Sequence, residues 1–215
     1  MPGRRNMDLS LYLVTDRQLA GERPIEEIVR QAISGGVTTI QLREKEAPSG
    51  EFFKIASSLR ALTRKAGVTF IVNDRIDIVL AAGADGVHVG QEDLPAERAR
   101  ELLGDNRILG VTAANEEEAL AAAAGGADYI GCNAVFSTPT KTDTGPAMGL
   151  NGLERLVNCV DIPVVAIGGI NAGNAGDVLS TGVTGIAVVS AIISADDPAL
   201  AARELRNLIN QKKQE

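Results

Sequence analysis

Eight runs of β-branched and other apolar residues alternate with helical patterns along the chain, and this alternation constrains the fold more than any other feature. The strand-like runs span residues 11–15, 38–43, 69–74, 86–90, 108–112, 129–136, 163–169 and 185–192. The helical patterns include residues 24–34, 51–66, 95–103, 115–124 and 198–210. Strict alternation of strand and helix is typical of parallel strands joined by crossover helices.

A weak repeat supports this interpretation. GVTTI at 36–40, GADGV at 83–87, GADYI at 126–130 and GVTGI at 182–186 each precede a strand-like run. Each leading glycine can end the preceding helix in the left-handed conformation before the chain extends. Eight such units close naturally into a barrel, whereas an open doubly wound sheet usually has fewer strands. The sequence therefore predicts one α/β domain over residues 1–215, a (β/α)₈ TIM barrel, with residues 1–8 as a flexible N-terminal extension.

Composition excludes several classes of function. The net charge of −7 and the aromatic content of 3% argue against a nucleic-acid-binding surface, which needs a basic face. No segment reaches the roughly 20 apolar residues of a membrane span, and the amino terminus lacks the apolar stretch of a signal peptide. We therefore expect a cytoplasmic protein with no membrane partner. Two cysteines without CxxC spacing, Cys132 and Cys159, indicate core or near-core residues rather than a disulfide or metal framework.

Polar residues recur where the strand-like runs end. The stretches are QLREKE at 41–46, VND at 72–74, GVHVGQED at 86–93 and STPTKTD at 137–143. The carboxyl ends of parallel strands meet on one face, and in barrels this face carries the active site. Cations beside carboxylates and hydroxyls suit a diphosphate held by Mg²⁺.

The QLREKE stretch supplies the cations. Strand alternation points Gln41, Arg43 and Lys45 to the same side, where a guanidinium and an ammonium can clamp a polyphosphate. The alternative is an exposed strand end in which Arg43 and Lys45 pair with Glu44 and Glu46.

Carboxylates follow the third and fourth strands. Asn73 and Asp74 end the third strand, and Asp93 comes shortly after the fourth. Neighbouring strands can bring Asp74 and Asp93 to one hard cation, so they are the candidate Mg²⁺ ligands. The alternative is a helix N-cap at Asn73–Asp74 and an ordinary first-turn charge at Asp93.

The last three strand ends carry candidates for anion binding. Thr138, Thr140 and Lys141 lie in a long loop that can order around a ligand, or that is a solvated surface loop. Gly168, Gly169 and Ser190 lie at the ends of the seventh and eighth strands, where barrels often bind phosphate through backbone N–H groups. A simple turn would also explain the glycine pair.

The single histidine, His88, lies inside the fourth strand-like run. No acid or nucleophile is spaced to form a catalytic triad with it. We therefore expect His88 to have a buried structural role, or to act through a neighbouring residue.

Taken in order, these stretches resemble the thiamin phosphate synthase family over roughly residues 9–210. The resemblance is carried by LYLVTD, QLREKE, FIVNDR, ADGVHVGQEDLP, ILGVT, ADYIG, STPTKTD, VVAIGGI and GIAVVSAI. It implies a (β/α)₈ barrel that joins hydroxymethylpyrimidine diphosphate to thiazole phosphate or its carboxylated form. The reaction releases pyrophosphate and uses Mg²⁺.

The resemblance also implies roles for individual residues. Contacts to the pyrimidine diphosphate are implied for Gln41, Arg43, Lys45 and Asn73, and Mg²⁺ ligation for Asp74 and Asp93. Thr112 stands where the family commonly has serine, and Lys141 matches the lysine of its PTxTK-like loop, so both join Arg43 as candidate catalytic residues. Contacts to the thiazole phosphate are implied for Thr138, Thr140, Gly169, Val189 and Ser190.

The chain departs from the family pattern in two places. The family more often has a glycine-proline pair before the aromatic residue of the sixth strand, where this chain reads CNAVF, and a proline where Ser137 stands. Ala114 stands where the family frequently has histidine. These changes concern loop geometry more than the reaction. A thiazole tautomerase-like relative and a non-catalytic phosphate-binding barrel remain alternatives, and a homo-oligomer is left open.

Overall fold

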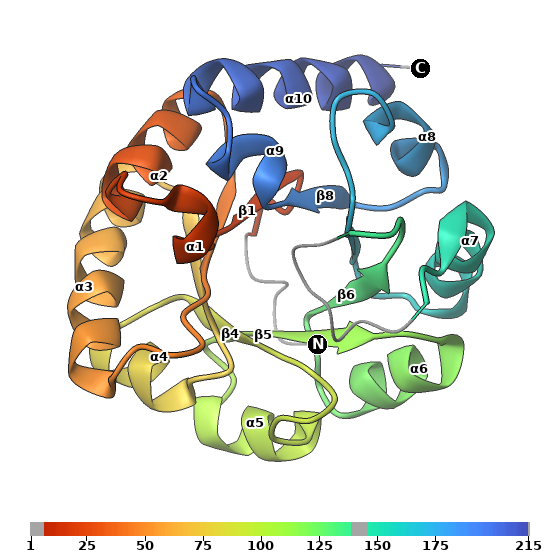
Figure 1. Cartoon of the computed structure of the whole chain (residues 1–215). Coiled ribbons are helices and arrows are strands. Elements are labelled where there is room, and N and C mark those ends of the chain that lie inside the picture. Colours follow the sequence, from red (N-terminus) through yellow and green to blue (C-terminus); the bar gives the residue numbers. More distant parts are fainter. Residues whose placement is uncertain (1–6, 139–145, 215) are drawn as a thin grey trace.

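The computed structural model describes residues 7–138 and 146–214, and these form a ring of strands surrounded by helices (Figure 1). The strands are Leu11–Val14 (β1), Thr39–Leu42 (β2), Thr69–Asn73 (β3), Gly86–Val89 (β4), Ile108–Ala113 (β5), Tyr129–Ala134 (β6), Val164–Ile167 (β7) and Gly185–Val188 (β8). All eight are parallel to their neighbours, and β1 pairs with β8, which closes the barrel. The predicted (β/α)₈ fold class is confirmed.

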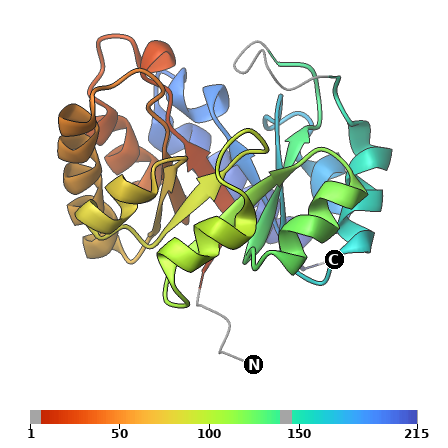
Figure 2. The same cartoon turned by 90° about the horizontal axis from the view of Figure 1, so that it is seen from below.

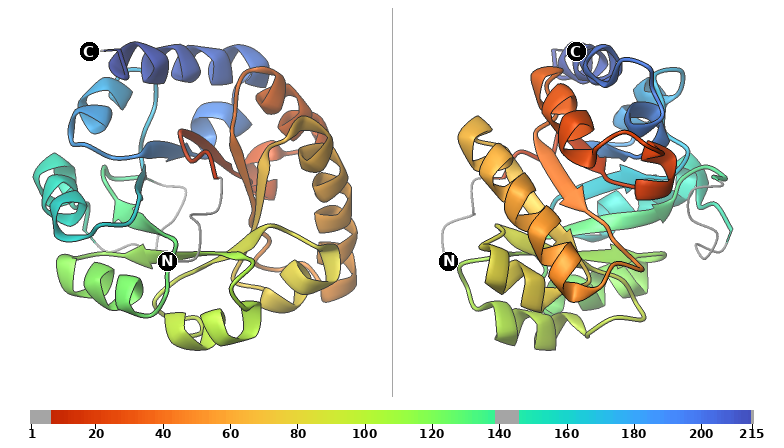
Figure 3. Two further views of the ribbon diagram at one scale, coloured as in Figure 1. Left: turned by 180° about the vertical axis from the view of Figure 1, so that it is seen from behind. Right: turned by 60° about the vertical axis from the view of Figure 1, so that its left-hand side comes forward.

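Helices follow the strands and cover the outside of the ring, as the view from below and the two further views show (Figures 2 and 3). They are Arg17–Ala20 (α1), Ile25–Ser34 (α2), Ser49–Ala66 (α3), Ile76–Ala82 (α4), Ala96–Leu103 (α5), Glu116–Ala124 (α6), Gly149–Cys159 (α7), Ala175–Ser180 (α8), Ser190–Ile193 (α9) and Pro198–Lys212 (α10). Side-chain caps begin three of them: Asp16, Asn115 and Asp197 each accept a backbone N–H of the first turn. Within the described residues, no helix is long and apolar enough to cross a membrane.

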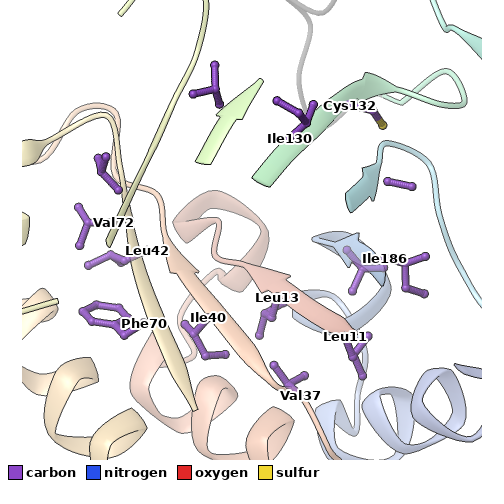
Figure 4. Close-up of a cluster of buried hydrophobic side chains, with 14 of the residues drawn as sticks. Leu11, Leu13, Val37, Ile40, Leu42, Phe70, Val72, Ile130, Cys132 and Ile186 are labelled. Carbon is purple, nitrogen blue, oxygen red and sulfur yellow. The ribbon is translucent and has the colours of Figure 1, made fainter. Parts of the chain in front are cut away.

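Alternation along the strands sorts the apolar residues into two clusters. On β1, Leu11 and Leu13 face the helices, whereas Tyr12 and Val14 face the barrel interior. Figure 4 shows the outer cluster, where Leu11 and Leu13 lie with Ile40 of β2 and Phe70 of β3. The inner cluster also holds Leu9, Ile71, Ile108, Tyr129, Val165 and Ala187. The barrel is therefore a packed core with its open end at the carboxyl ends of the strands.

Gly110 makes room for one of the two tyrosines in the barrel interior. A Cβ on Gly110 of β5 would lie 2.2 Å from the Tyr129 ring. The four repeat glycines have the expected positive φ angles, of 104° at Gly36, 66° at Gly83, 89° at Gly126 and 88° at Gly182.

Seven of the eight strand-like runs continue past the end of their strand, and the last two show why. The run 163–169 forms a strand only over Val164–Ile167, because Gly168 and Gly169 have φ angles of 99° and 68°. The run 185–192 is a strand only to Val188, since Val189 has ψ −84° and α9 begins at Ser190. Apolar residues continue past the strand because α9 buries Ile192 and Ile193.

The N-terminal extension predicted over residues 1–8 lies mostly outside the described residues. Met7 packs partly against the inner cluster, and the Asp8 carboxylate accepts a hydrogen bond from the Ser10 backbone N–H at 2.9 Å. The two cysteines lie where expected, with Cys132 buried in β6 and Cys159 half-buried at the end of α7.

Candidate active site

A cavity of about 160 Å³ lies at the carboxyl ends of the strands. Its walls include every candidate site residue within the described part of the chain: Gln41, Arg43, Lys45, Asn73, Asp74, Asp93, Thr112, Thr138, Gly169, Val189 and Ser190. Thr140 and Lys141 lie outside the described residues. Residues from the ends of all eight strands, far apart in the sequence, therefore share one space.

The cations reach the cavity from the end of β2. The Arg43 backbone N–H donates to the Thr15 hydroxyl at 3.0 Å, which fixes the segment beside β1. The Lys45 ammonium lies 2.7 Å from an Asp74 carboxylate oxygen. Lys45 is therefore paired with a carboxylate of the next strand.

Glu44 does not line the cavity. Its carboxylate lies 3.1 Å from Arg17 of α1, its side chain is 5% exposed, and its Oε1 has no hydrogen-bond partner among the described residues. Burial raises the pKa of Glu44 above its usual value. Glu44 thus pairs with Arg17, which leaves the charges of Arg43 and Lys45 directed to the cavity.

The two predicted metal ligands converge. Asp74 has φ 62°, the one positive φ at a non-glycine residue in the described part of the chain, and its N–H donates to the His88 carbonyl at 2.8 Å. Asp93 accepts from the Gly90 N–H at 2.7 Å. Burial raises the pKa of Asp93, and the neighbouring Asp74 carboxylate raises it further. Two carboxylates that disfavour each other's charge are suited to a shared hard cation.

This carboxylate pair fits Mg²⁺ in one specific way. Among residues 7–138 and 146–214, no group of three or more histidine, cysteine or acidic side chains could hold a metal ion. Mg²⁺ commonly binds through one or two carboxylates and completes its shell with water and substrate phosphate oxygens. Asp74 and Asp93 can therefore hold Mg²⁺ as part of a metal–diphosphate complex, but not as an all-protein site.

A chain of hydrogen bonds forms the floor of the cavity. The Gln41 amide donates to the Tyr12 hydroxyl at 2.8 Å, and the two tyrosine hydroxyls lie 2.8 Å apart. His88 Nδ1 lies 3.0 Å from the Tyr129 hydroxyl, and Nε2 lies 2.9 Å from Thr112 Oγ1. Burial raises the pKa values of both tyrosines, so both phenols remain protonated.

The sequence reasoning missed Tyr12 and Tyr129 as cavity residues. Both lie on strand positions that face inward, and they are the only tyrosines in the chain, which was the available signal. The role predicted for His88 stays a prediction. The structure places its ring between the side chains of Tyr129 and Thr112.

The opposite wall is made of backbone. A Cβ on Gly168 would lie 2.5 Å from the Ala134 Cα, and one on Gly169 would lie 2.8 Å from the Phe136 Cβ. The Gly169 carbonyl accepts from the Asn174 side chain at 2.9 Å, which holds the turn after β7. With Ser190 exposed at the start of α9, this wall offers the close backbone approach that a phosphate group needs.

The departure from the family pattern coincides with an irregularity of the barrel. The pairing register of β6 with β7 shifts between Gly131 and Ala134, and Cys132, Asn133 and Ala134 line the cavity. The Ile167 N–H donates to the Cys132 sulfur at 3.3 Å. Ala114 borders a second hollow beside α6 and α7 and does not line the main cavity.

Comparisons with known proteins agree with one another. Residues 11–192 match the family model described as thiamine monophosphate synthase. A thiamine-phosphate synthase of Moorella thermoacetica is 52% identical, over 94% of this chain and 96% of the relative. A second, from Ruminiclostridium cellulolyticum, is also 52% identical, over 97% of this chain and 99% of the relative.

Solved structures give the same result. A thiamine phosphate pyrophosphorylase from Pyrococcus furiosus has a TM-score of 0.88 and 47% identity, with 95% of this chain and 97% of that chain covered. A 3-hexulose-6-phosphate synthase, at 21% identity and a TM-score of 0.65, shares the barrel fold alone. Family model, sequence relatives and structure together show that this chain belongs to the thiamine monophosphate synthase family.

Proposed function

We propose that the chain joins 4-amino-2-methyl-5-hydroxymethylpyrimidine diphosphate to 4-methyl-5-hydroxyethylthiazole phosphate, giving thiamin phosphate and pyrophosphate. The observation that carries the proposal is the meeting of Lys45, Asp74 and Asp93 at one edge of the cavity, where cation and carboxylates suit a metal-bound diphosphate. The names of the relatives support this reaction.

The residues divide the task between a diphosphate end and a phosphate end. Asp74 and Asp93 would hold Mg²⁺, which when bound would supply positive charge opposite the departing pyrophosphate. Gln41, Arg43, Lys45, Asn73 and Thr112 bind the pyrimidine diphosphate. Thr138, Thr140, Gly169, Val189 and Ser190 bind the thiazole phosphate. Lys141 supplies positive charge to the departing pyrophosphate.

The cavity favours a mechanism without a covalent enzyme intermediate. Cys132 is the strongest nucleophile among the described residues that line it, but burial raises the pKa of its thiol to about 12. A thiol that stays protonated at neutral pH is a poor nucleophile. The pyrimidine methylene therefore loses pyrophosphate to give a cation stabilised by its ring amino group, and the thiazole nitrogen attacks that cation. The protein positions the reactants and neutralises charge.

A turnover assay tests this function. We expect pyrophosphate release that requires both substrates and Mg²⁺ and that equals the thiamin phosphate formed. Lys45→Met should lower turnover about 10²-fold by removing a charge-assisted contact. Lys54→Met, on the exposed side of α3, is the matched control and should retain wild-type turnover.

The two alternative functions, a thiazole tautomerase and a non-catalytic binding protein, predict different results in this assay. A tautomerase would convert the thiazole substrate alone without releasing pyrophosphate, and a binding protein would bind ligand without turnover. Either outcome would overturn the proposal. The carboxylated thiazole substrate, the cytoplasmic location and the homo-oligomer stay predictions.

A further inference from the structure

This 215-residue protein has two tyrosines and one histidine, and all three belong to one continuous series of hydrogen bonds. It runs from Gln41 on β2 through Tyr12 and Tyr129 to His88, and ends at Thr112 on β5. Its four contacts measure 2.8, 2.8, 3.0 and 2.9 Å. Every side chain in it lines the cavity.

The Gln41 amide sets the donor-to-acceptor direction of this series of hydrogen bonds. Its Nε2 group donates to the Tyr12 oxygen, so the single O–H of Tyr12 is left to donate to Tyr129. Tyr129 in turn has one proton, which it donates to His88 Nδ1. Both phenols keep their protons because burial raises the pKa values of Tyr12 and Tyr129.

The same direction determines the state of the histidine. A neutral imidazole that accepts at Nδ1 carries its proton at Nε2, which then donates to Thr112 Oγ1. Gly131 leaves space for this ring, since a Cβ there would lie 2.8 Å from His88 Cε1. The Thr112 oxygen is thus an acceptor toward His88, and its own proton is directed elsewhere.

We propose that Tyr12, Tyr129 and His88 are positioning residues that make Thr112 a hydrogen-bond donor to the pyrimidine substrate and leave the Gln41 carbonyl oxygen as an acceptor. The role toward substrate rests on the proposed function. The direction of the hydrogen bonds does not, because it follows from the ligand-free protein. If the hydrogen bonds ran in the reverse direction, Thr112 would be an acceptor toward the substrate and Gln41 a donor. The direction therefore decides which substrate atoms Thr112 and Gln41 can bind.

Nitrogen-15 NMR of the histidine tests the direction without assignment ambiguity, since the chain has one histidine. In full-length, ligand-free protein we expect a protonated Nε2 and an unprotonated Nδ1. A proton on Nδ1, alone or together with one on Nε2, would overturn the proposal. Because this measurement needs no turnover, it remains decisive even if the proposed reaction is wrong.

Variants then separate positioning from packing. Tyr129→Phe removes the donor to Nδ1, so both nitrogen shifts should move toward the average of two tautomers. Thr112→Val keeps that donor and should retain the wild-type tautomer. Ile71→Val alters the same interior cluster without a polar group and serves as the matched control for the shifts and for activity. An unchanged single tautomer in Tyr129→Phe would show that Tyr129 has only a packing role.

Kinetics test the consequence for substrate. Thr112→Val should lower kcat about 10-fold, Thr112→Ser should restore it, and Tyr129→Phe should lower it several-fold. If Tyr129 acts through Thr112, adding Tyr129→Phe to Thr112→Val should change kcat less than about 2-fold. Should the two effects multiply instead, Tyr129 would not act through Thr112 and the positioning role would be refuted.

Discussion

Replacing Asp93 by asparagine should separate the metal-binding role of this residue from its structural role. The Asp93 carboxylate accepts the Gly90 N–H at 2.7 Å, and an asparagine carbonyl can accept the same hydrogen bond. The fold around the end of β4 should therefore be retained. What the substitution removes is one of the two negative charges that face each other across the site.

The two effects of that charge have opposite signs. Two unit charges about 4 Å apart interact by about 4 kcal/mol at an effective dielectric constant of about 20, and less where solvent screens them. Losing one carboxylate should thus weaken Mg²⁺ binding by about 3 kcal/mol, or about 10²-fold. In metal-free protein the substitution relieves repulsion from Asp74, so the free energy of unfolding should stay equal or rise by up to about 1 kcal/mol.

The pH dependence follows from the raised pKa of Asp93. A folded-state pKa above the unfolded value means that the ionised carboxylate destabilises the metal-free fold at neutral pH, and that this cost disappears as pH falls through the folded pKa. The stability gain of Asp93→Asn should therefore shrink on acidification. Urea unfolding of metal-free protein at several pH values measures it.

Asp77→Asn is the matched control. Asp77 lies in the first turn of α4, is 61% exposed and pairs with Arg75, which holds the pKa of its carboxyl below the usual value. That variant should keep its Mg²⁺ dependence and lose a little stability. Pyrophosphate release at varied Mg²⁺ compares the two variants. An Asp93→Asn protein with wild-type rate and Mg²⁺ dependence would refute the metal assignment.

Three further predictions concern single residues. Gly110→Ala should cost about 3 kcal/mol, or roughly 6 to 12 °C in Tm, because its Cβ meets the Tyr129 ring; Gly176→Ala in α8, with open space, should not destabilise. Gly169→Val should raise KM for the thiazole phosphate more than for the pyrimidine substrate, and equal increases would indicate general disruption. Lys141→Ala should lower kcat about 10²-fold in pyrophosphate release, and an unchanged rate would remove this lysine from the mechanism.

The fold could be predicted from the sequence because its signal is local. Alternating strand and helix patterns need no knowledge of distant contacts, and the closed barrel follows from their number. The end of β8 could not be read this way. The apolar run continues through Ile192 because α9 buries the same residue types as a strand, so composition does not separate the two.

The site was predictable where a residue's position on its own strand decides its direction. Gln41 and Arg43 line the cavity because alternation along β2 points both of them inward. The Tyr12–Tyr129 contact joins residues 117 positions apart, and nothing in either local pattern specifies the partner. Likewise, the sequence places several cations near Glu44, and its pairing with Arg17 became apparent only from the folded structure.

The pairing of β1 with β8 ties the order of synthesis to completion of the barrel. The other seven strand pairs join neighbours in the sequence, whereas this pair joins residue 11 to residue 186. On the ribosome, the edge of β1 therefore stays without its partner until β8 has been made. An unpaired parallel edge is a template for pairing with another chain. Emergence of the last strand removes both open edges in one step, and α10, packed against α2 and α8, then covers the seam.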